Sequence, residues 1–339
     1  MMKHSKPSYP RTVAILSVLL LTAAVGSAAL GRYPIGLREI FGILGEKLFH
    51  IAPFWTPTQA SLLLVHRIPR IALACMVGCC LSAAGASYQG VFQNPMASPD
   101  ILGASSGAAF GAALAILLGL GGTAIVVFAF LASLLTVLLV ILVGNRVRGK
   151  RVVGLILTGI MVSSLISSGT SFIKLIADPE DQLPAITYWL MGSLNGAQPK
   201  DVGLAVLPML IGLLPLLLLR WRLNILTFGD DEARTMGVNA KRLRTVVILC
   251  STLITAASVA VSGMIGWIGL VIPHLARRLV GNNYKTLMPV SMLMGALFLL
   301  VVDDLSRTLF AAEIPIGILT ALVGAPFFLH LITRDGEQL

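Results

Sequence analysis

Ten apolar segments, each about as long as a helix that crosses a lipid bilayer, dominate the sequence. A hydrocarbon core of roughly 30 Å requires about 20 residues of helix. Only 12% of the 339 residues are charged and 56% are hydrophobic, which leaves too few polar groups to solvate a soluble protein. We therefore expect an all-α membrane protein, one domain over residues 1–339, with about ten transmembrane helices. The predicted spans are Val13–Leu30, Ile71–Phe92, Ile101–Leu120, Thr123–Val143, Val152–Ile173, Val202–Leu219, Thr245–Ser262, Met264–Val280, Leu287–Val302 and Ile314–Ile332.

The distribution of charge between the loops predicts the orientation of these spans. In a ten-span topology, 17 of the 25 Lys and Arg residues lie on the side of the N-terminus and 8 on the other side. Because cytoplasmic loops are enriched in Lys and Arg, both termini are predicted to be cytoplasmic. The basic residues before the first apolar segment resemble the start of a signal peptide. A small-residue cleavage site is missing, so Val13–Leu30 is interpreted as a retained span.

Two segments outside the spans have helical patterns. On the external side, Leu37–Leu48 has apolar residues at helical spacing and is expected to lie flat on the membrane surface. The longest cytoplasmic loop, at about residues 221–244, contains the second segment. There Asp230 is expected to cap a short helix, Asp231 and Glu232 suit its first turn, and Gly237 suits its end.

Glycines mark two places where backbones are expected to pack closely. Gly103, Gly107 and Gly111 repeat every four residues and place one bare face along the third span. A second group, Gly263, Gly266 and Gly269, precedes Pro273 and predicts a tight or broken entry into the eighth span.

Several kinds of chemistry are poorly supported by the sequence. Residues 144–151 approach a phosphate-binding loop, but Arg151 stands where a hydroxyl must hold magnesium, so we do not interpret the loop as a nucleotide site. Cysteines are confined to apolar segments and are expected to be free thiols, not a metal site. Histidines are scattered, so an intramembrane enzyme is not indicated. The basic residues form no face interleaved with aromatics, so nucleic acid is not an expected partner.

Charged residues at the external ends of spans leave two interpretations open. Asp303 and Arg307 are four residues apart and can pair on one helix face. Arg67 and Arg70 lie at the external mouth of the second span, against the general charge trend. Together with Arg307 they could reach lipid phosphates or could dock carboxylates of a soluble protein.

The motifs along the chain resemble those of the permeases for iron-siderophores, haem and cobalamin that depend on a binding protein. The resemblance covers nearly the whole chain. Its residues are Arg67-Ile-Pro-Arg70, Gly85, Gln89, Asn94-Pro-Met96-Ala-Ser-Pro-Asp100-Ile-Leu-Gly103, Ser106-Gly107, Gly229-Asp230, Ala233-Arg234, Gly237-Val238, Gly266-Trp-Ile-Gly269-Leu-Val-Ile-Pro273-His274, Arg277, Pro315-Ile-Gly317 and Gly324-Ala-Pro326-Phe-Phe.

The resemblance implies one part of a larger ATP-driven importer with a type II permease fold. The chain would form a homodimer in the bacterial cytoplasmic (inner) membrane, in contact with lipid, two cytoplasmic ATPase subunits and an external substrate-binding protein. ATP and Mg would be bound by the ATPase, and this chain would bind no cofactor or metal. The cargo would be a metal chelate, an iron-siderophore complex first, with haem or cobalamin as alternatives and an oxyanion also known among such importers.

The resemblance also assigns roles to residues. By similarity, Gly229, Asp230, Asp231, Glu232, Ala233, Arg234 and Gly237 couple the permease to the ATPase, and Arg67, Arg70 and Arg307 dock the binding protein. The cytoplasmic gate would comprise Asn94, Met96, Val152 and Val153, although Met96 replaces the usual Leu and some relatives carry hydroxyl residues at the two valines.

A rival of another class is a secondary carrier that needs no ATPase. Asp303 and Asp304 would then bind a coupling ion, and five plus five spans would allow an inverted repeat. The predicted cytoplasmic helix at Asp230–Gly237 would have no purpose in such a carrier, which favours the importer.

Overall fold

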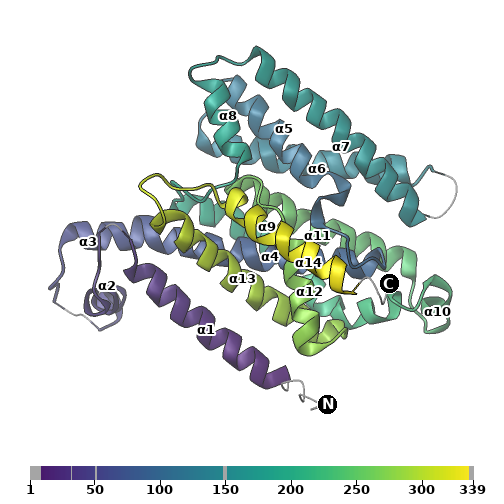
Figure 1. Cartoon of the computed structure of the whole chain (residues 1–339), viewed down its shortest axis with the longest axis horizontal. Coiled ribbons are helices and arrows are strands. Elements are labelled where there is room, and N and C mark those ends of the chain that lie inside the picture. The colour runs from purple at the N-terminus through teal and green to yellow at the C-terminus, as the bar shows by residue number, and fades with distance from the viewer. Residues whose placement is uncertain (1–8, 32, 50–51, 148–150, 336–339) are drawn as a thin grey trace.

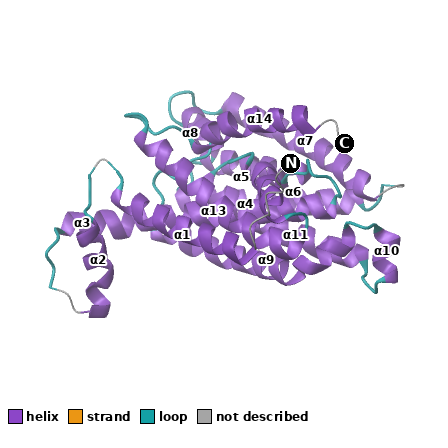
Figure 2. Ribbon diagram, turned by 60° about the horizontal axis from the view of Figure 1, so that its bottom comes forward, coloured by secondary structure: helices purple, strands orange, loops and turns teal. Residues whose placement is uncertain are grey.

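The structure is a computed structural model that describes residues 9–31, 33–49, 52–147 and 151–335. Within these residues it is a bundle of helices without a strand (Figures 1 and 2). The helices are α1 Tyr9–Ala29, α2 Leu37–Phe49, α3 Pro57–Ser61, the π-helix η1 Leu62–Arg67, α4 Ile68–Val91, the 3₁₀ helix η2 Pro99–Leu102, α5 Ala104–Leu117, α6 Gly122–Gly144, α7 Arg151–Ile176, α8 Gln182–Leu190, α9 Pro199–Leu226, α10 Asp230–Thr235, α11 Ala240–Ser262, α12 Ile268–Val280, α13 Tyr284–Thr308 and α14 Ile316–Asp335.

Each of the ten predicted spans contains a helix, so the predicted all-α membrane fold is confirmed. Among the residues that the structure describes, seven continuous helices are long and apolar enough to cross a membrane, the second of them running from Pro57 through η1 to Val91. Shorter apolar helices occupy the third and tenth spans, at Ala104–Leu117 and Ile316–Leu329. The eighth span holds the 13-residue α12.

Helix α4 lies in the middle of the bundle and packs against α9, α11, α12 and α13. Two of these contacts are backbone to backbone. A Cβ atom at Gly78 would lie 2.2 Å from the carbonyl oxygen of Gly295 in α13, and one at Gly85 would lie 1.8 Å from that of Gly269 in α12. Only glycine permits such approaches, so these residues determine how close the central helices come.

The bare face of α5 lies against α6 and α7. A Cβ atom at Gly107 would lie 2.4 Å from Thr136 Oγ1, and one at Gly111 would lie 2.3 Å from the carbonyl oxygen of Phe128. At Gly103 the backbone turns between η2 and α5 with a φ of 79°, a conformation that favours glycine.

The eighth span differs from its prediction at its start. The sequence pattern begins the span at Met264, but the helix begins only at Ile268. The backbone between α11 and α12 has positive φ angles at Gly263 (67°) and Trp267 (70°), which interrupt the helix. The predicted broken entry is therefore present, and it shortens the span.

The elements outside the spans separate to opposite ends of the molecule. Helix α10 lies at the end where α1 begins and α14 finishes, while α2 and α3 project from the opposite end (Figure 1). This arrangement agrees with the predicted topology, in which both termini and the coupling loop lie on one side of the membrane. Helix α2 spans Leu37–Phe49, so the predicted helix is present, and its place on the external side stays a prediction.

Candidate transport surfaces at the two ends of the bundle

The short helix α10 is fixed to the bundle by its inner face and exposes its charges. Ala233 is fully buried, and the Val238 amide donates to its carbonyl oxygen at 2.9 Å. Asp231 and Arg234 are 94% and 75% exposed, so the 3.8 Å ion pair between them contributes little stability. Gly237 follows the helix with a φ of 76° and ends it, as predicted.

The start of α10 corrects one detail of the prediction. Gly229, with a φ of 117°, occupies the N-cap position, and Asp230 is the first residue inside the helix. A glycine is required there because the backbone conformation is one that a Cβ atom disfavours. Asp231 and Glu232 do lie in the first turn, where carboxylates interact favourably with the helix dipole.

A polar network connects the base of this surface to the central helices. Asn224, near the end of α9, donates to the Asn283 side chain at 3.0 Å and accepts from the Tyr284 amide at 2.8 Å. From α12, Arg277 donates to the Tyr284 hydroxyl at 3.3 Å and to Gln89 Oε1 of α4 at 2.5 Å. Sequence reasoning did not assign Asn224, Asn283 or Tyr284, although polar residues at the ends of apolar segments were the available signal.

The predicted gate residues lie in two separate segments. Asn94 and Met96 are exposed in the turn after α4, where Asn94 Oδ1 accepts from the Met96 amide at 2.8 Å. Val152 and Val153 lie in the first turn of α7, with Val152 packed partly against the core and Val153 half exposed. Their role as a gate stays a prediction.

A cavity of about 620 Å³ lies beside the interrupted eighth span. Most of its lining is apolar and comes from residues 264–266 and α14, but Asp100 and Ser105 contribute an acceptor and a hydroxyl that bond to one another. Neither residue was a predicted site residue, because only the tertiary structure places η2 beside α14.

The three arginines predicted for docking gather at the end of the bundle opposite α10. Arg67 is 5% exposed and donates to the backbone carbonyls of Ala28, Ala29 and Tyr33. Its position follows from the π-helix η1, which ends at Arg67. This arginine holds the end of α1 and the following loop against α4.

The other two arginines bind carboxylates. Arg70 lies 2.9 Å from the fully buried Asp303 and 3.0 Å from Glu313. Arg307 pairs with Asp304 and donates to the backbone carbonyls of Ser27 and Leu30.

The predicted pair of Asp303 with Arg307 is therefore wrong. The i, i+4 spacing allowed that pair, but α4 packs along α13 and offers Arg70 to Asp303 instead. Arg307 pairs with Asp304 at i, i+3. In this structure the arginines bind groups of their own chain, and docking stays a prediction.

The comparison with known proteins identifies the family of the chain. The model of the FecCD transport family matches residues 18–334. The chain belongs to the FecCD transport family. The predicted resemblance to iron-chelate, haem and cobalamin permeases is thereby confirmed, as is the assignment to the permeases of ATP-binding cassette importers.

Individual relatives in this family match almost end to end. The chain is 41% identical to the molybdate import system permease MolB of Haemophilus influenzae, over 96% of each chain. It is 42% identical to a probable iron chelatin permease of Helicobacter pylori, over 80% of this chain and 82% of that one. A solved metal-chelate type ABC transporter in an inward-facing conformation superposes with a TM-score of 0.86 at 39% identity, covering 96% of this chain and 99% of the other.

Proposed function

We propose that this FecCD permease is the membrane-spanning part of an importer for a metal-containing ligand. It acts as a homodimer in the bacterial cytoplasmic membrane with both termini inside. Two ATPase subunits bind ATP and Mg and attach at α10, and a binding protein delivers the ligand at the opposite end. The observation that supports this function best is α10. This helix is anchored through the buried Ala233, and its charged side chains Asp231 and Arg234 are exposed to solvent, where a partner can contact them.

The mechanism follows from the position of α10. Closure of the ATPase pair on ATP would push α10, and the hydrogen bonds of Asn224 and Arg277 would transmit the movement to α13 and α4. Rigid-body movement of the two permease subunits would then open the pathway alternately to each side. The transported ligand passes along this chain, and ATP hydrolysis takes place in the ATPase subunits.

The second copy is proposed to cover α7 and α14. Apolar side chains more than half exposed recur along α7 at Leu157, Met161, Leu165 and Phe172, and α14 exposes Leu322. Figure 2 shows α7 and α14 along the same edge of the molecule, with α9 along the opposite edge. The Asp100 cavity opens beside α14, so this edge would line the pathway between two copies.

An iron-siderophore complex is the cargo that we propose first. Relatives in the family are named for iron chelatin and for molybdate, so the scaffold accepts both a large chelate and a small oxyanion. Haem and cobalamin remain alternatives from the family. A carrier that uses Asp303 and Asp304 for a coupling ion is disfavoured, because both carboxylates are bound to arginines.

Replacing residues 230–237 with a flexible Gly-Ser linker is expected to reduce ATP-dependent uptake to background. The linker removes the rigid element through which the ATPase moves the bundle. Uptake is measured in proteoliposomes that hold the complete complex, with a ferric siderophore, haem, cobalamin and molybdate tested in parallel. The ligand that the unmodified complex transports identifies the cargo.

The control for this experiment is Thr235→Ala, which keeps α10 helical and changes an exposed position. It should leave uptake close to that of the unmodified complex. Full uptake by the linker variant would refute coupling through α10, and uptake without ATP would favour the carrier.

We also propose that the binding protein docks at the end that holds Arg67, Arg70 and Arg307. Charge reversal by Arg307→Glu is expected to weaken its association and to reduce the dependence of affinity on salt. Because Arg307 also holds α1, the thermal unfolding midpoint is measured for each variant. Arg307→Lys keeps the charge and serves as the control. Unchanged affinity across salt concentrations would exclude direct docking.

A further inference from the structure

A groove on the outer surface of the bundle joins an apolar half to a polar half. The apolar half has a volume of about 380 Å³ and lies between α6 and α9, and the polar half, of about 650 Å³, lies between α8 and the start of α9. Val126, Ala260 and Val261 line both halves, so the two adjoin each other. The proposed transport pathway beside α14 uses other residues.

The apolar half lies where α6 and α9 both pack on α11, which contributes two alanines there. Ala257 and Ala260 form the floor, and Leu207 of α9 and Val127 of α6 form opposite walls. Leu207 is 65% exposed, so nothing in the described chain covers this wall. In a bilayer the groove would therefore contact acyl chains.

The length of the groove corresponds to one leaflet. From Lys200 in the polar half to Ile211 in the apolar half, α9 advances eleven residues, which is about 17 Å of helix. Half of a hydrocarbon core of roughly 30 Å is about 15 Å. The polar half consequently lies at the level of the external membrane surface.

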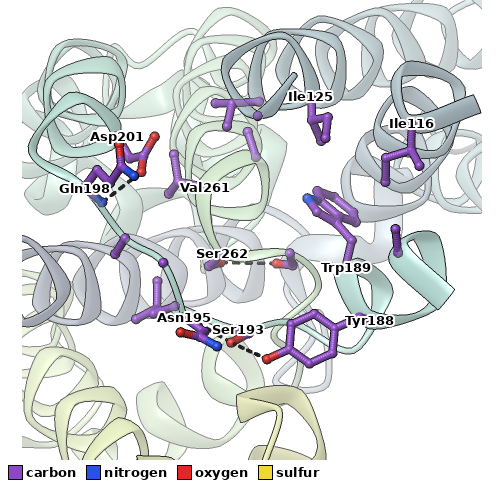
Figure 3. Close-up of a pocket in the computed structure, with 18 of the residues that line it drawn as sticks. Ile116, Ile125, Tyr188, Trp189, Ser193, Asn195, Gln198, Asp201, Val261 and Ser262 are labelled. Carbon is purple, nitrogen blue, oxygen red and sulfur yellow. Dashed lines mark hydrogen bonds between the residues drawn. The ribbon is translucent and has the colours of Figure 1, made fainter. Parts of the chain in front are cut away.

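The polar half combines interfacial aromatics with charges of both signs. Figure 3 shows Tyr188, Trp189 and Asp201 among its lining residues. Tyr188 and Trp189 line one side, and such residues prefer the level of lipid headgroups. On the other side the backbone N–H of Gln198 donates to one carboxylate oxygen of Asp201 at 2.9 Å. Lys200 is exposed and forms no ion pair with any residue that the structure describes.

We infer that this groove binds one phospholipid of the outer leaflet, with an ethanolamine headgroup. An acyl chain fills the apolar half between α6 and α9. The phosphate binds the Lys200 ammonium, and the lipid ammonium binds near the Asp201 carboxylate. The adjacent opposite charges match a zwitterionic headgroup better than an anionic one, which Asp201 would repel.

The test measures which lipid stays bound to the purified permease. The protein is reconstituted in nanodiscs of equal parts dioleoyl-phosphatidylethanolamine and dioleoyl-phosphatidylglycerol, released into detergent, and weighed by native mass spectrometry. The unmodified permease should retain phosphatidylethanolamine in preference to phosphatidylglycerol. Leu207→Trp, which fills the groove from an exposed position, should lower retention to the detergent background.

Two matched variants separate the groove from general effects. Leu218→Trp makes the same change on α9 at a residue that is 76% exposed and outside the groove, and it should retain lipid normally. Lys200→Glu should lower phosphatidylethanolamine retention about two- to fivefold, as expected for an exposed charge contact. Lys174→Glu, at the external end of α7, should leave retention unchanged.

Three results would overturn the inference. Equal retention by Leu207→Trp and the unmodified permease would show that the groove is not the binding site. Equal retention of the two lipids would refute the ethanolamine assignment. A protein found in the groove in place of lipid, by crosslinking from Val127→Cys, would show another occupant.

Discussion

Asp303→Ala is expected to destabilise the permease by about 3 kcal/mol, which is a large part of the stability of a folded protein, about 5 to 15 kcal/mol. Asp303 is fully buried and lies 2.9 Å from Arg70, which is itself 11% exposed. The substitution leaves the Arg70 guanidinium in a poorly hydrated site with only Glu313 as an anionic partner. Removing one partner of a buried ion pair leaves a charge that is only partly compensated, which costs more free energy than the intact pair contributes.

Thermal unfolding of the purified permease in detergent measures this effect, and a double variant tests its cause. Arg70→Met combined with Asp303→Leu removes both charges and should recover most of the lost stability. Glu313→Gln is the milder comparison, because Glu313 is 24% exposed and water can replace part of its interaction. If the double variant is as unstable as Asp303→Ala, the buried charge is not the cause.

Gly85→Ala is expected to destabilise the bundle by about 3 kcal/mol, the upper part of the range for overpacked cores. The added Cβ atom would lie 1.8 Å from the carbonyl oxygen of Gly269, 2.5 Å from its carbonyl carbon and 2.6 Å from its Cα atom. All three neighbours are backbone atoms, so no side chain can rotate away. Helices α4 and α12 must separate, which also disturbs the contact of Gln89 with Arg277 one turn further along α4.

The matched control is Gly203→Ala in α9, where an added Cβ atom meets nothing within 4 Å. Because glycine is a poor helix former, this change should be neutral or should stabilise by about 0.5 to 1 kcal/mol. Unfolding midpoints of both variants are compared with that of the unmodified protein. A stable Gly85→Ala variant would contradict the backbone contact between α4 and α12.

Local patterns were sufficient to predict a helix in each span and the two helices outside the spans, but not the short helices α3, η1, η2 and α8. Apolar length predicted a helix at each of ten places, and the acidic turn with Gly237 predicted α10. The prediction failed where a residue's partner is distant in sequence. Asp303 binds Arg70, which is 233 positions away, whereas sequence spacing pointed to Arg307. Spacing along one helix cannot reveal which side of that helix meets a neighbour.

The same limit applies to the candidate site. The exposed charged face of α10 follows from its sequence, because charged side chains that flank a buried Ala233 on a short helix must point to solvent. The Asp100 cavity and the groove between α6 and α9 do not, because each forms where three or more elements leave a gap. The four cysteines, predicted to be free thiols, are free in the structure.

The sequence by itself determined that the chain crosses a membrane many times, because apolar segments of that length cannot be hydrated. It also determined where α10 forms, since the signals that start and stop a short helix are local. Only the tertiary structure decided which carboxylate each arginine binds, where the eighth span is interrupted, and where the surface is hollow. Those features depend on packing between helices, and packing is set by contacts between residues far apart in the chain.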